Sequence, residues 1–525
     1  MQRSKFFPVL ASCLAVFGLL LVSGVGSSAG ASSSGGTITW AKPDEAQSLD
    51  PHTDFNGNTW KFFFPVYDTL VTTGETLDLQ PGIAESWEQT SPTTYVFQLR
   101  KNAAFSNGRP VVASDVVGSL ERVLDPDTGS WWANALGAVS EIVAEGDHVV
   151  RIELEKPHTQ LLSALAHVST AIMPMEEYAA GTFDPTKELM GSGPFMVTEH
   201  LQDQSWTYEA NPHYWGEGLP VADELKILIV LDEAARIAAL RDGRADIGTF
   251  VNPDLPALLE GDENITVVTQ ETASYYNLDV NALSEQSPFT DIRVRQAMNL
   301  ALDREEISRV ALGGMGAVDY PLPRTFPSSK VCVDVPSYSG SREERLESAR
   351  ALMSEAGAEG VEIDLLTTSA LPSLIHIAQV IKQQLADIDM NANILQLGYA
   401  EWIDAVWVRG EFDLNVTWLS GYGDPAIVLG SWNPEKTGWN AHYLVSDPEL
   451  NDKIAEAAET PSGDERDALF AEICALIDDG ANMVALVNKN SIIAYRNDRV
   501  EVNIHPAEGY EDELKYIEEF ARIAP

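Results

Sequence analysis

Polar and apolar positions follow two alternating patterns along the chain, and these predict strands and helices in turn. Residues 94–99 (TYVFQL) alternate with a period of two and are rich in β-branched and aromatic side chains, which is typical of a strand. Residues 37–40 predict an earlier strand. Residues 113–124 carry apolar side chains at helical spacing, with Ser114 as the expected cap, and predict a helix.

The same succession recurs further along the chain. A strand at 226–231 precedes a helix that Asp232 opens and Gly243 ends, and another helix is expected from Ser341 to Gly357. A β-α-β-α-β run follows, with strands at 361–366, 392–397 and 412–418 and helices at about 374–386 and around Trp402. This order predicts an α/β fold class with parallel sheets and crossover helices.

The N-terminus predicts export. Arg3 and Lys5 precede an apolar run that gives way to small residues, and Ala29 and Ala31 form a cleavage signal, so residues 1–31 are interpreted as a signal peptide. Two alternatives are a retained membrane anchor and a lipoprotein modified at Cys13. Lipidation at Cys13 is disfavoured because most of the apolar run would then follow the lipid. We expect a periplasmic or extracellular protein.

Chain length limits the number of domains, and net charge limits the classes of partner. The chain has 525 residues, which is too many for a single core, so two or three domains are expected. Its 79 acidic residues against 34 basic ones give a net charge of −45, which repels nucleic acid and anionic lipid surfaces. The plain interpretation of this charge is a soluble acidic surface. Nucleic acid is therefore excluded as a partner.

Cys332 and Cys474 are the cysteines that remain after signal cleavage. One disulfide and two buried free thiols are both compatible with their separation in sequence.

A search for catalytic motifs finds none. Phosphate-loop, dinucleotide-binding, HExxH and EF-hand patterns are absent, and no two histidines stand at metal-ligand spacing. Gly191-Ser192-Gly193 lacks the flanking pattern of a serine nucleophile and is interpreted as a turn before a strand. We expect no catalytic residues, no metal and no cofactor, and hence a protein that is not an enzyme.

Several short segments, taken in order over nearly the whole chain, resemble the extracellular solute-binding proteins of family 5, which include the oligopeptide-, dipeptide- and nickel-binding components of ABC importers. The matching stretches are SLDP (48–51), VYDTLV (66–71), PGIAESWE (81–88), FSNGRPVVASDVVGSLERVLDP (105–126), GSGPFMV (191–197), NPHYWG (211–216), ALRDGRADI (239–247), DIRVRQAMNLALDREEI (291–307) and GDP (423–425).

The resemblance implies a periplasmic-binding-protein type of fold with two discontinuous lobes. The large lobe is expected at 32–274 plus 486–525, with a subdomain inserted at about 55–190, and the small lobe at 275–485. Two crossover strands are expected near 275–281 and 483–487. A hinged pair of lobes closes on a solute and presents it to a permease with its ATPase subunits. The resemblance also implies a monomer.

The loop after the predicted strand 412–418 is the leading candidate site, because ligands of open α/β sheets bind at the carboxyl ends of strands. Trp418 and Tyr422 match positions that line the cleft in relatives. With weaker candidates, the predicted ligand-binding residues are Trp418, Tyr422, Asp424, Trp432, Asp50, His52 and Asn107.

One departure from the family bears on specificity. In peptide-binding relatives, an aspartate three residues after the matching tryptophan pairs with the peptide's α-amino group. Here that position is Gly421. The nearby Asp424 matches a D-P turn, so it either shapes the loop or contacts the ligand.

An oligopeptide or dipeptide is the expected ligand. The alternative within the family is an oligosaccharide or opine, since aromatic faces also stack on sugar rings. Nickel chelates and haem are disfavoured because the loop has no histidine. An extracellular hydrolase and a surface adhesin or receptor domain are the alternatives from other classes.

Overall fold

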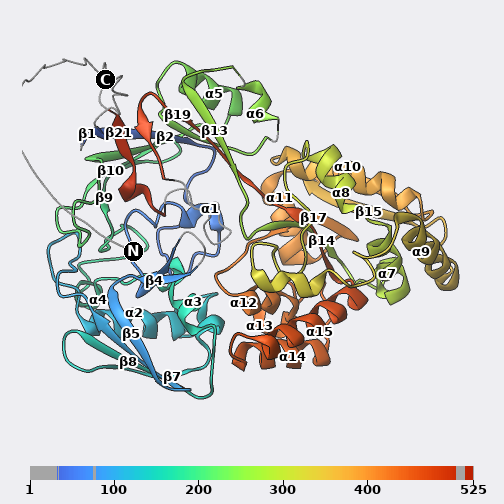
Figure 1. The fold of residues 1–525 in the computed structure, drawn as a ribbon, viewed down its shortest axis with the longest axis horizontal. Helices are drawn as coiled ribbons and strands as arrows, with labels where there is room; N and C mark the ends of the chain where they lie inside the picture. Colours follow the sequence, from blue (N-terminus) through green and yellow to red (C-terminus); the bar gives the residue numbers. More distant parts are fainter. Residues whose placement is uncertain are drawn as a thin grey trace, which may run out of the picture.

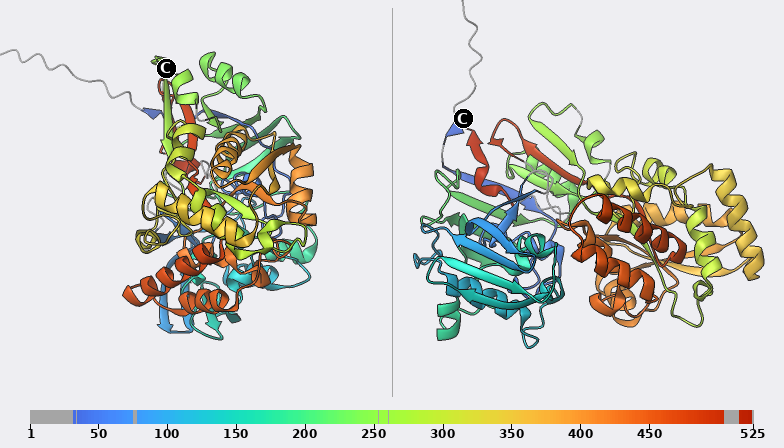
Figure 2. Two further views of the ribbon diagram at one scale, coloured as in Figure 1. Left: turned by 90° about the vertical axis from the view of Figure 1, so that its right-hand side faces the viewer. Right: turned by 60° about the horizontal axis from the view of Figure 1, so that its bottom comes forward.

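The computed structural model describes residues 32–33, 35–74, 78–252, 254–259, 261–503 and 515–523. They form two lobes side by side, joined by two short segments that pass from one to the other (Figure 1). The large lobe contains both ends of the described chain, and the right view of Figure 2 shows the same division from another side. The predicted signal peptide, its alternatives and Cys13 lie outside the described residues.

The large lobe is built on a seven-stranded sheet. Its strands, in spatial order, are β13 (Ile265–Gln270), β19 (Ser491–Arg496), β12 (Ile247–Phe250), β2 (Thr37–Lys42), β11 (Glu224–Ile229), β10 (Ser205–Ala210) and β9 (Phe195–Leu201). Helices α5 (Glu233–Arg241) and α6 (Leu255–Leu258) belong to this lobe. The ring of Phe520, from the C-terminal segment, stacks on Trp40 of β2 at 6.0 Å, which ties the end of the chain to the first long strand.

A second sheet of the large lobe lies between β2 and β9 in sequence. It orders β5 (Ala84–Ser91), β6 (Thr94–Leu99), β8 (Val149–Leu154) and β7 (Val139–Ala144), all antiparallel. The helices of this part are α1 (Gly57–Trp60), α2 (Ala113–Leu124), α3 (Leu161–Leu165) and α4 (Met175–Ala180). Two short sheets pair β3 (Val71–Thr73) with β4 (Leu79–Pro81), and β21 (Ala521–Ile523) with β1 (Ser32–Ser33) and β20 (Val500–Glu501).

The small lobe has a five-stranded sheet with its own core. The order is β16 (Asn391–Leu397), β15 (Glu362–Thr368), β17 (Leu414–Leu419), β14 (Tyr275–Val280) and β18 (Met483–Asn488). Its helices are α7 (Ile292–Ala301), α8 (Arg304–Ala311), α9 (Arg342–Ala356), α10 (Pro372–Ala386), α11 (Tyr399–Ile403), α12 (Pro425–Leu429), α13 (Pro434–Thr437), α14 (Pro448–Glu459) and α15 (Asp464–Gly480). One continuous apolar cluster fills this lobe.

The α/β class is confirmed, but both main sheets are mixed rather than parallel. Crossover helices give parallel pairs, such as β15 with β16 and β2 with β11. Strands joined by a short turn, such as β9 and β10, pair antiparallel instead. The strands that enter and leave the small lobe, β14 and β18, are antiparallel neighbours because the chain runs through them in opposite directions.

Local helix signals account for most helix ends. Ser341 caps α9 in a reciprocal pair with Glu344, and Gly357 ends it with a φ of 64°. The expected cap Ser114 is wrong: α2 begins after Val112, whose N–H donates to the Asp115 carboxylate at 3.1 Å. The first-turn acid thus makes the bond to the cap residue's N–H, while the Asp115 N–H donates to the Val112 carbonyl at 2.9 Å where a capping hydroxyl would otherwise accept.

The two lobes meet at a crossing of two short segments, 271–274 between β13 and β14 and 489–490 between β18 and β19. The Asn488 side-chain amide donates to Thr272 O at 2.7 Å, to Ser274 O at 3.2 Å and to the Asp319 carboxylate at 3.2 Å. Thr272 Oγ1 donates to Lys489 O at 2.7 Å. Hydrogen bonds thus hold the two crossing segments together at the expected hinge.

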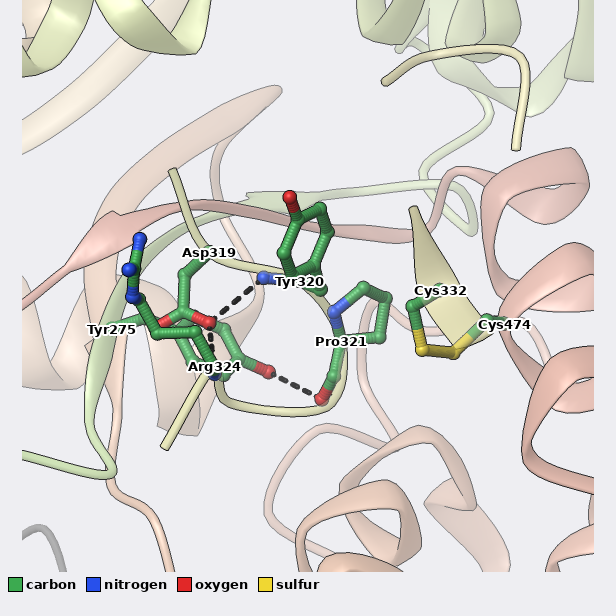
Figure 3. Close-up of a disulfide and its surroundings, with 7 residues drawn as sticks. All are labelled: Tyr275, Asp319, Tyr320, Pro321, Arg324, Cys332 and Cys474. Carbon is green, nitrogen blue, oxygen red and sulfur yellow. Dashed lines mark hydrogen bonds between the residues drawn. A yellow bond between two sulfur atoms is a disulfide. The ribbon is translucent and has the colours of Figure 1, made fainter. Parts of the chain in front are cut away.

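Cys332 and Cys474 form a disulfide between the segment before α9 and helix α15 (Figure 3). Their Cα atoms are 5.3 Å apart, and both residues are fully buried. The nearby turn from Asp319 to Arg324 is held by Tyr320 N and Arg324 N, which donate to Asp319 at 2.9 and 2.7 Å. The two cysteines are therefore joined in a disulfide and are not free thiols.

Candidate functional site

The loop after β17 lies where the two lobes meet. Trp418 is near the end of β17 and pairs across to Tyr276 of β14. Its ring stacks on Trp402 with centroids 6.3 Å apart, and the Lys489 Nζ lies 5.6 Å from its centroid. The Trp418 side chain is half-buried. Its ring, on the small lobe, lies beside the Lys489 ammonium of the crossing segment.

Tyr422 connects the small lobe to the large one. Its ring is 5.4 Å from Trp132 and 6.3 Å from His167, both of the large lobe. It packs against the small-lobe core and against two separate apolar clusters of the large lobe. Burial raises the pKa of its hydroxyl above the ordinary value.

The partners of Tyr422 belong to a cluster of rings on the large lobe. Trp131 stacks on Trp60 at 5.3 Å, and Trp132 stacks on His167 at 4.0 Å. Trp60 Nε1 and Trp131 Nε1 both donate to Asp54 O, at 3.0 and 2.7 Å. We call Trp60, Trp131, Trp132 and His167 the large-lobe ring cluster.

Charges in the large-lobe ring cluster are suppressed by burial. Burial lowers the pKa of His167 well below its usual value, and the nearby Lys515 ammonium lowers it further, so the imidazole is neutral at pH 7. Its Nδ1 accepts from Ser169 N at 3.0 Å. Burial also raises the pKa of Asp54 to about 6, so its carboxylate is still mostly ionised at pH 7. The two rings that face Tyr422, Trp132 and His167, are uncharged at this pH.

Asp424 is engaged within the small lobe. Its carboxylate accepts from Arg466 at 3.1 and 2.8 Å and from Ala426 N at 2.8 Å, where it caps α12. Asp424 and Arg466 are 8% and 4% exposed. This bidentate ion pair fixes the loop to α15, and both carboxylate oxygens of Asp424 take part in it.

The other predicted residues lie apart from the loop. Trp432 is in the small-lobe core, where Nε1 donates to Met483 O at 3.3 Å. Asp50 forms a buried ion pair with Arg122 at 2.5 Å. His52 Nε2 is 2.8 Å from Ala171 O.

Burial lowers the pKa of His52 to about 4, so it is neutral at pH 7. Asn107 is exposed, and its amide donates to Glu177 at 2.7 Å.

The structure therefore brings Trp418 and Tyr422 to the lobe junction and keeps Asp424 in the same loop, bonded to Arg466. It leaves Trp432, Asp50, His52 and Asn107 in separate surroundings. Sequence reasoning missed the large-lobe ring cluster and Lys489. The adjacent pair Trp131-Trp132 was a usable signal, because tryptophan is large and is rarely buried completely.

The structure also bears on a metal site and on a cavity elsewhere in the molecule. Within the described ranges, no three His, Cys, Asp or Glu side chains are placed to hold a metal ion. A cavity of about 260 Å³ lies between α6 of the large lobe and α8 and α10 of the small one, and its lining includes none of the seven predicted residues.

Contacts outside the loop also join the lobes. Asn134 Nδ2 donates to Lys436 O at 2.6 Å, and Thr159 donates to Ala458 O through both its N–H and its hydroxyl, each at 2.9 Å. Lys156 pairs with Glu459. With Tyr422, these bonds join the two lobes directly.

Comparison with known proteins gives consistent matches. The model of bacterial extracellular solute-binding proteins, family 5 (middle region), matches residues 78–440. The periplasmic oligopeptide-binding protein OppA of Salmonella typhimurium is 26% identical over 468 residues, covering 83% of this chain and 84% of OppA. The dipeptide-binding protein DppE of Bacillus subtilis is 26% identical over 438 residues, covering 76% and 78%.

Solved structures match over nearly the whole chain. The binding protein AgaA of A. tumefaciens R10, in complex with agropinic acid, has a TM-score of 0.80 at 24% identity, covering 93% of this chain and 99% of AgaA. DppA of Helicobacter pylori, in complex with the peptide STSA, has a TM-score of 0.81 at 22% identity, covering 94% and 99%. In the part of the chain with assigned positions, no helix has the length and apolar character needed to cross a membrane.

Proposed function

The chain belongs to the bacterial extracellular solute-binding proteins, family 5, and from this membership we propose that it captures a short peptide between its lobes and delivers it to the permease of an ABC importer. The observation that carries the proposal is Tyr422, a loop residue of the small lobe packed on the large-lobe ring cluster. A ligand held at this junction touches both lobes, and only such a ligand has a different affinity for the open and closed forms. The curated relatives OppA and DppE, named for the peptides they bind, support the peptide as ligand.

The proposed site centres on Trp418 and Tyr422, with Trp132 and Lys489 beside them. Aromatic faces cover ligand side chains while contributing little rotamer entropy to lose on binding. Asp424, Trp432, Asp50, His52 and Asn107 remain weaker candidates. For the first four, the proposed contribution is to hold the loops in place, since all are buried.

We further propose the lobe limits expected from the sequence, 32–274 plus 486–525 and 275–485, with a subdomain inserted at about 55–190. The apolar cluster of the small lobe runs from Ala273 to Val487 and supports this division. Export is proposed to depend on residues 1–31, with cleavage after Ala31. The protein is proposed to act as a monomer without catalysis, metal or cofactor, the solute leaving unchanged.

A second candidate is an opine or oligosaccharide ligand. The observation that favours it is Gly421, which replaces the acidic side chain expected for a peptide's amino end. The structural likeness to AgaA is compatible with this alternative but shows only the fold.

A calorimetric titration tests which class of ligand the protein binds. Protein unfolded and refolded to remove any retained ligand is titrated with a mixture of di- to pentapeptides and, separately, with β-linked disaccharides and an opine. The proposal expects heat of binding and a rise in melting temperature with the peptides. Binding of a disaccharide or the opine alone would replace it with the second candidate.

A further inference from the structure

A buried acid lies in the small-lobe sheet behind the candidate site. Asp279 of β14 is 1% exposed. Its carboxylate accepts from Asn277 Nδ2 at 2.7 Å and from Asn415 Nδ2 at 3.1 Å, and the Tyr443 hydroxyl donates to it at 3.4 Å. Burial raises the pKa of Asp279 to about 7, against the effect of these three donors. Such a network either fixes the packing of the core or sets the position of a side chain at its edge.

Asn415 connects this acid to an aromatic side chain. An ionised carboxylate only accepts hydrogen bonds, whereas a side-chain amide has a donating nitrogen and an accepting oxygen. Because the Asn415 nitrogen donates to Asp279, its oxygen faces the other way and accepts from Trp402 Nε1 at 2.7 Å. Asn415 and Trp402 are both 0% exposed, so water offers no substitute partner. The acid therefore sets which end of the amide faces Trp402.

Trp402 passes this constraint to Trp418. The two rings stack with centroids 6.3 Å apart and planes 28° from parallel. Trp407 meets the Trp402 ring edge-on at 4.8 Å, so Trp402 is held by a ring as well as by its hydrogen bond. Trp418 is half-buried, and the orientation of its ring depends on the ring against which it packs. Side chains that contact a ligand bind it more tightly when the residues behind them hold one rotamer.

We propose, resting on the proposed function, that Asp279 is a positioning residue for ligand binding, which acts through Asn415 and Trp402 to hold the ring of Trp418 in the orientation that meets the bound peptide. Asp279 itself touches no ligand, because the small lobe encloses it. Since the ring is fixed before the ligand arrives, binding costs it little conformational entropy.

Substitutions of two buried acids test the role of Asp279. Asp279→Leu removes the carboxylate that orients Asn415, and Asn415→Leu interrupts the same path if the first variant does not fold. Asp478→Leu is the matched control. Asp478 is a second buried acid of the small lobe, 8% exposed, and accepts from the Asn299 amide at 2.9 Å and from Ser337 N at 3.3 Å. None of these bonds involves Trp402 or Trp418.

Fluorine NMR of the intact protein labelled with 5-fluorotryptophan reports on Trp418 without any ligand. Trp418→Phe assigns the resonance, and spectra are taken at pH 8, about one unit above the pKa of Asp279. Asp279→Leu and Asn415→Leu are expected to shift or broaden the Trp418 resonance, whereas Asp478→Leu leaves it unchanged. An unchanged resonance in the first two variants, or an equal change in the control, would overturn the positioning role.

Calorimetric titration with the mixture of di- to pentapeptides measures the effect on binding. Asp279→Leu and Asn415→Leu are expected to bind about tenfold more weakly than wild type, and Asp478→Leu as tightly as wild type. Asp279→Asn should retain affinity, because the new amide oxygen still accepts from Asn415 once the Asn277 amide turns to accept from the new nitrogen. Variants that alter the Trp418 resonance and yet bind peptides as wild type does would contradict the inference.

Failure of the proposed function has a different signature. Wild type that gives no heat with the peptide mixture would remove the peptide function and leave the fluorine spectra unaffected. The disaccharide and opine titrations then replace the peptide titration for the same variants. Equal affinity of Asp279→Leu and wild type for the solute that binds would overturn the inference as well.

Discussion

The ring of Tyr422 lies 5.4 Å from the ring of Trp132, and this contact joins the loop after β17 of the small lobe to the large-lobe ring cluster. Replacing Tyr422 by Ala removes the contact together with apolar area that closure buries. We expect ligand affinity to fall by on the order of 1–3 kcal/mol and the free protein to become more open. Calorimetry and small-angle X-ray scattering measure the two effects. Tyr422→Phe keeps the ring and serves as the control; an unchanged radius of gyration in Tyr422→Ala would argue against the bridging role.

Hydrogen bonds outside the loop also join the lobes, and we expect them to favour closure. Asn134→Ala with Thr159→Val removes the side-chain bonds to Lys436 O and Ala458 O. Since each such bond contributes a net ~0.5–1.5 kcal/mol, the double variant should bind ligand about 5- to 160-fold more weakly with an unchanged melting temperature of the free protein. Asn102→Ala loses a bond to Trp215 O within the large lobe and is the control. Equal affinity in both variants would show that these contacts do not bias closure.

A Cβ added at Gly421 would lie 2.2 Å from Ala273 O, and this close approach predicts a cost for the smallest side chain. Gly421→Ala forces the loop away from Ala273 and should destabilise the protein by about 1–3 kcal/mol, as overpacking does. Gly430→Ala is the matched control, because a Cβ there meets nothing within 4 Å and the backbone is helical. It should be neutral or stabilising by about 0.4–1 kcal/mol. Denaturant unfolding measures both, and equal stability of the two variants would refute the steric account.

The disulfide closes a long loop. Cys332 and Cys474 are separated by 142 residues, so the bond restricts the unfolded chain strongly. Cys332→Ala with Cys474→Ala should lower the free energy of unfolding by about 2–5 kcal/mol. Ligand affinity of the folded variant should stay the same, because both sulfurs are buried in the small lobe away from the loop. Reduced wild type provides the comparison, and a variant as stable as the oxidised protein would contradict the prediction.

Asp319 makes stability depend on pH. Burial raises its pKa from 3.8 to about 7, so the folded state binds the proton more tightly than the unfolded state. The stabilisation from this proton is complete below 3.8 and is lost as pH rises through 7. Asp319→Asn lacks this dependence, so wild type should lose stability relative to the variant between pH 5 and pH 8, by at most about 1.4 kcal/mol per pH unit. Thermal unfolding at the two pH values tests it; parallel curves would exclude a titrating Asp319.

Much of the fold follows from local sequence. Periodicity placed α9, α10 and β15 to β17 within a few residues, since caps such as Ser341 and Gly357 act on their immediate neighbours. Local sequence does not encode the relative direction of neighbouring strands. For this reason the expectation of purely parallel sheets was wrong. The crossing segments themselves, 271–274 and 489–490, lie just outside the strands expected to cross, because β14 and β18 pair fully within the small-lobe sheet.

The site was harder to predict because its parts come together only in the folded protein. Trp418 and Tyr422 share one loop and were found by their place after a strand. Their partners Trp132 and His167 are hundreds of residues away in sequence. Asp424 likewise finds Arg466 on α15, a pairing that the D-P turn alone does not indicate.

The central claim is that the lobes close on a peptide, and native mass spectrometry of the exported protein tests it most directly. Protein purified without unfolding should show a mass excess that matches short peptides, and the excess should disappear from the Tyr422→Ala variant under the same conditions. A mass excess that fragments as a sugar or an opine, with no peptide in the bound fraction, would contradict the claim.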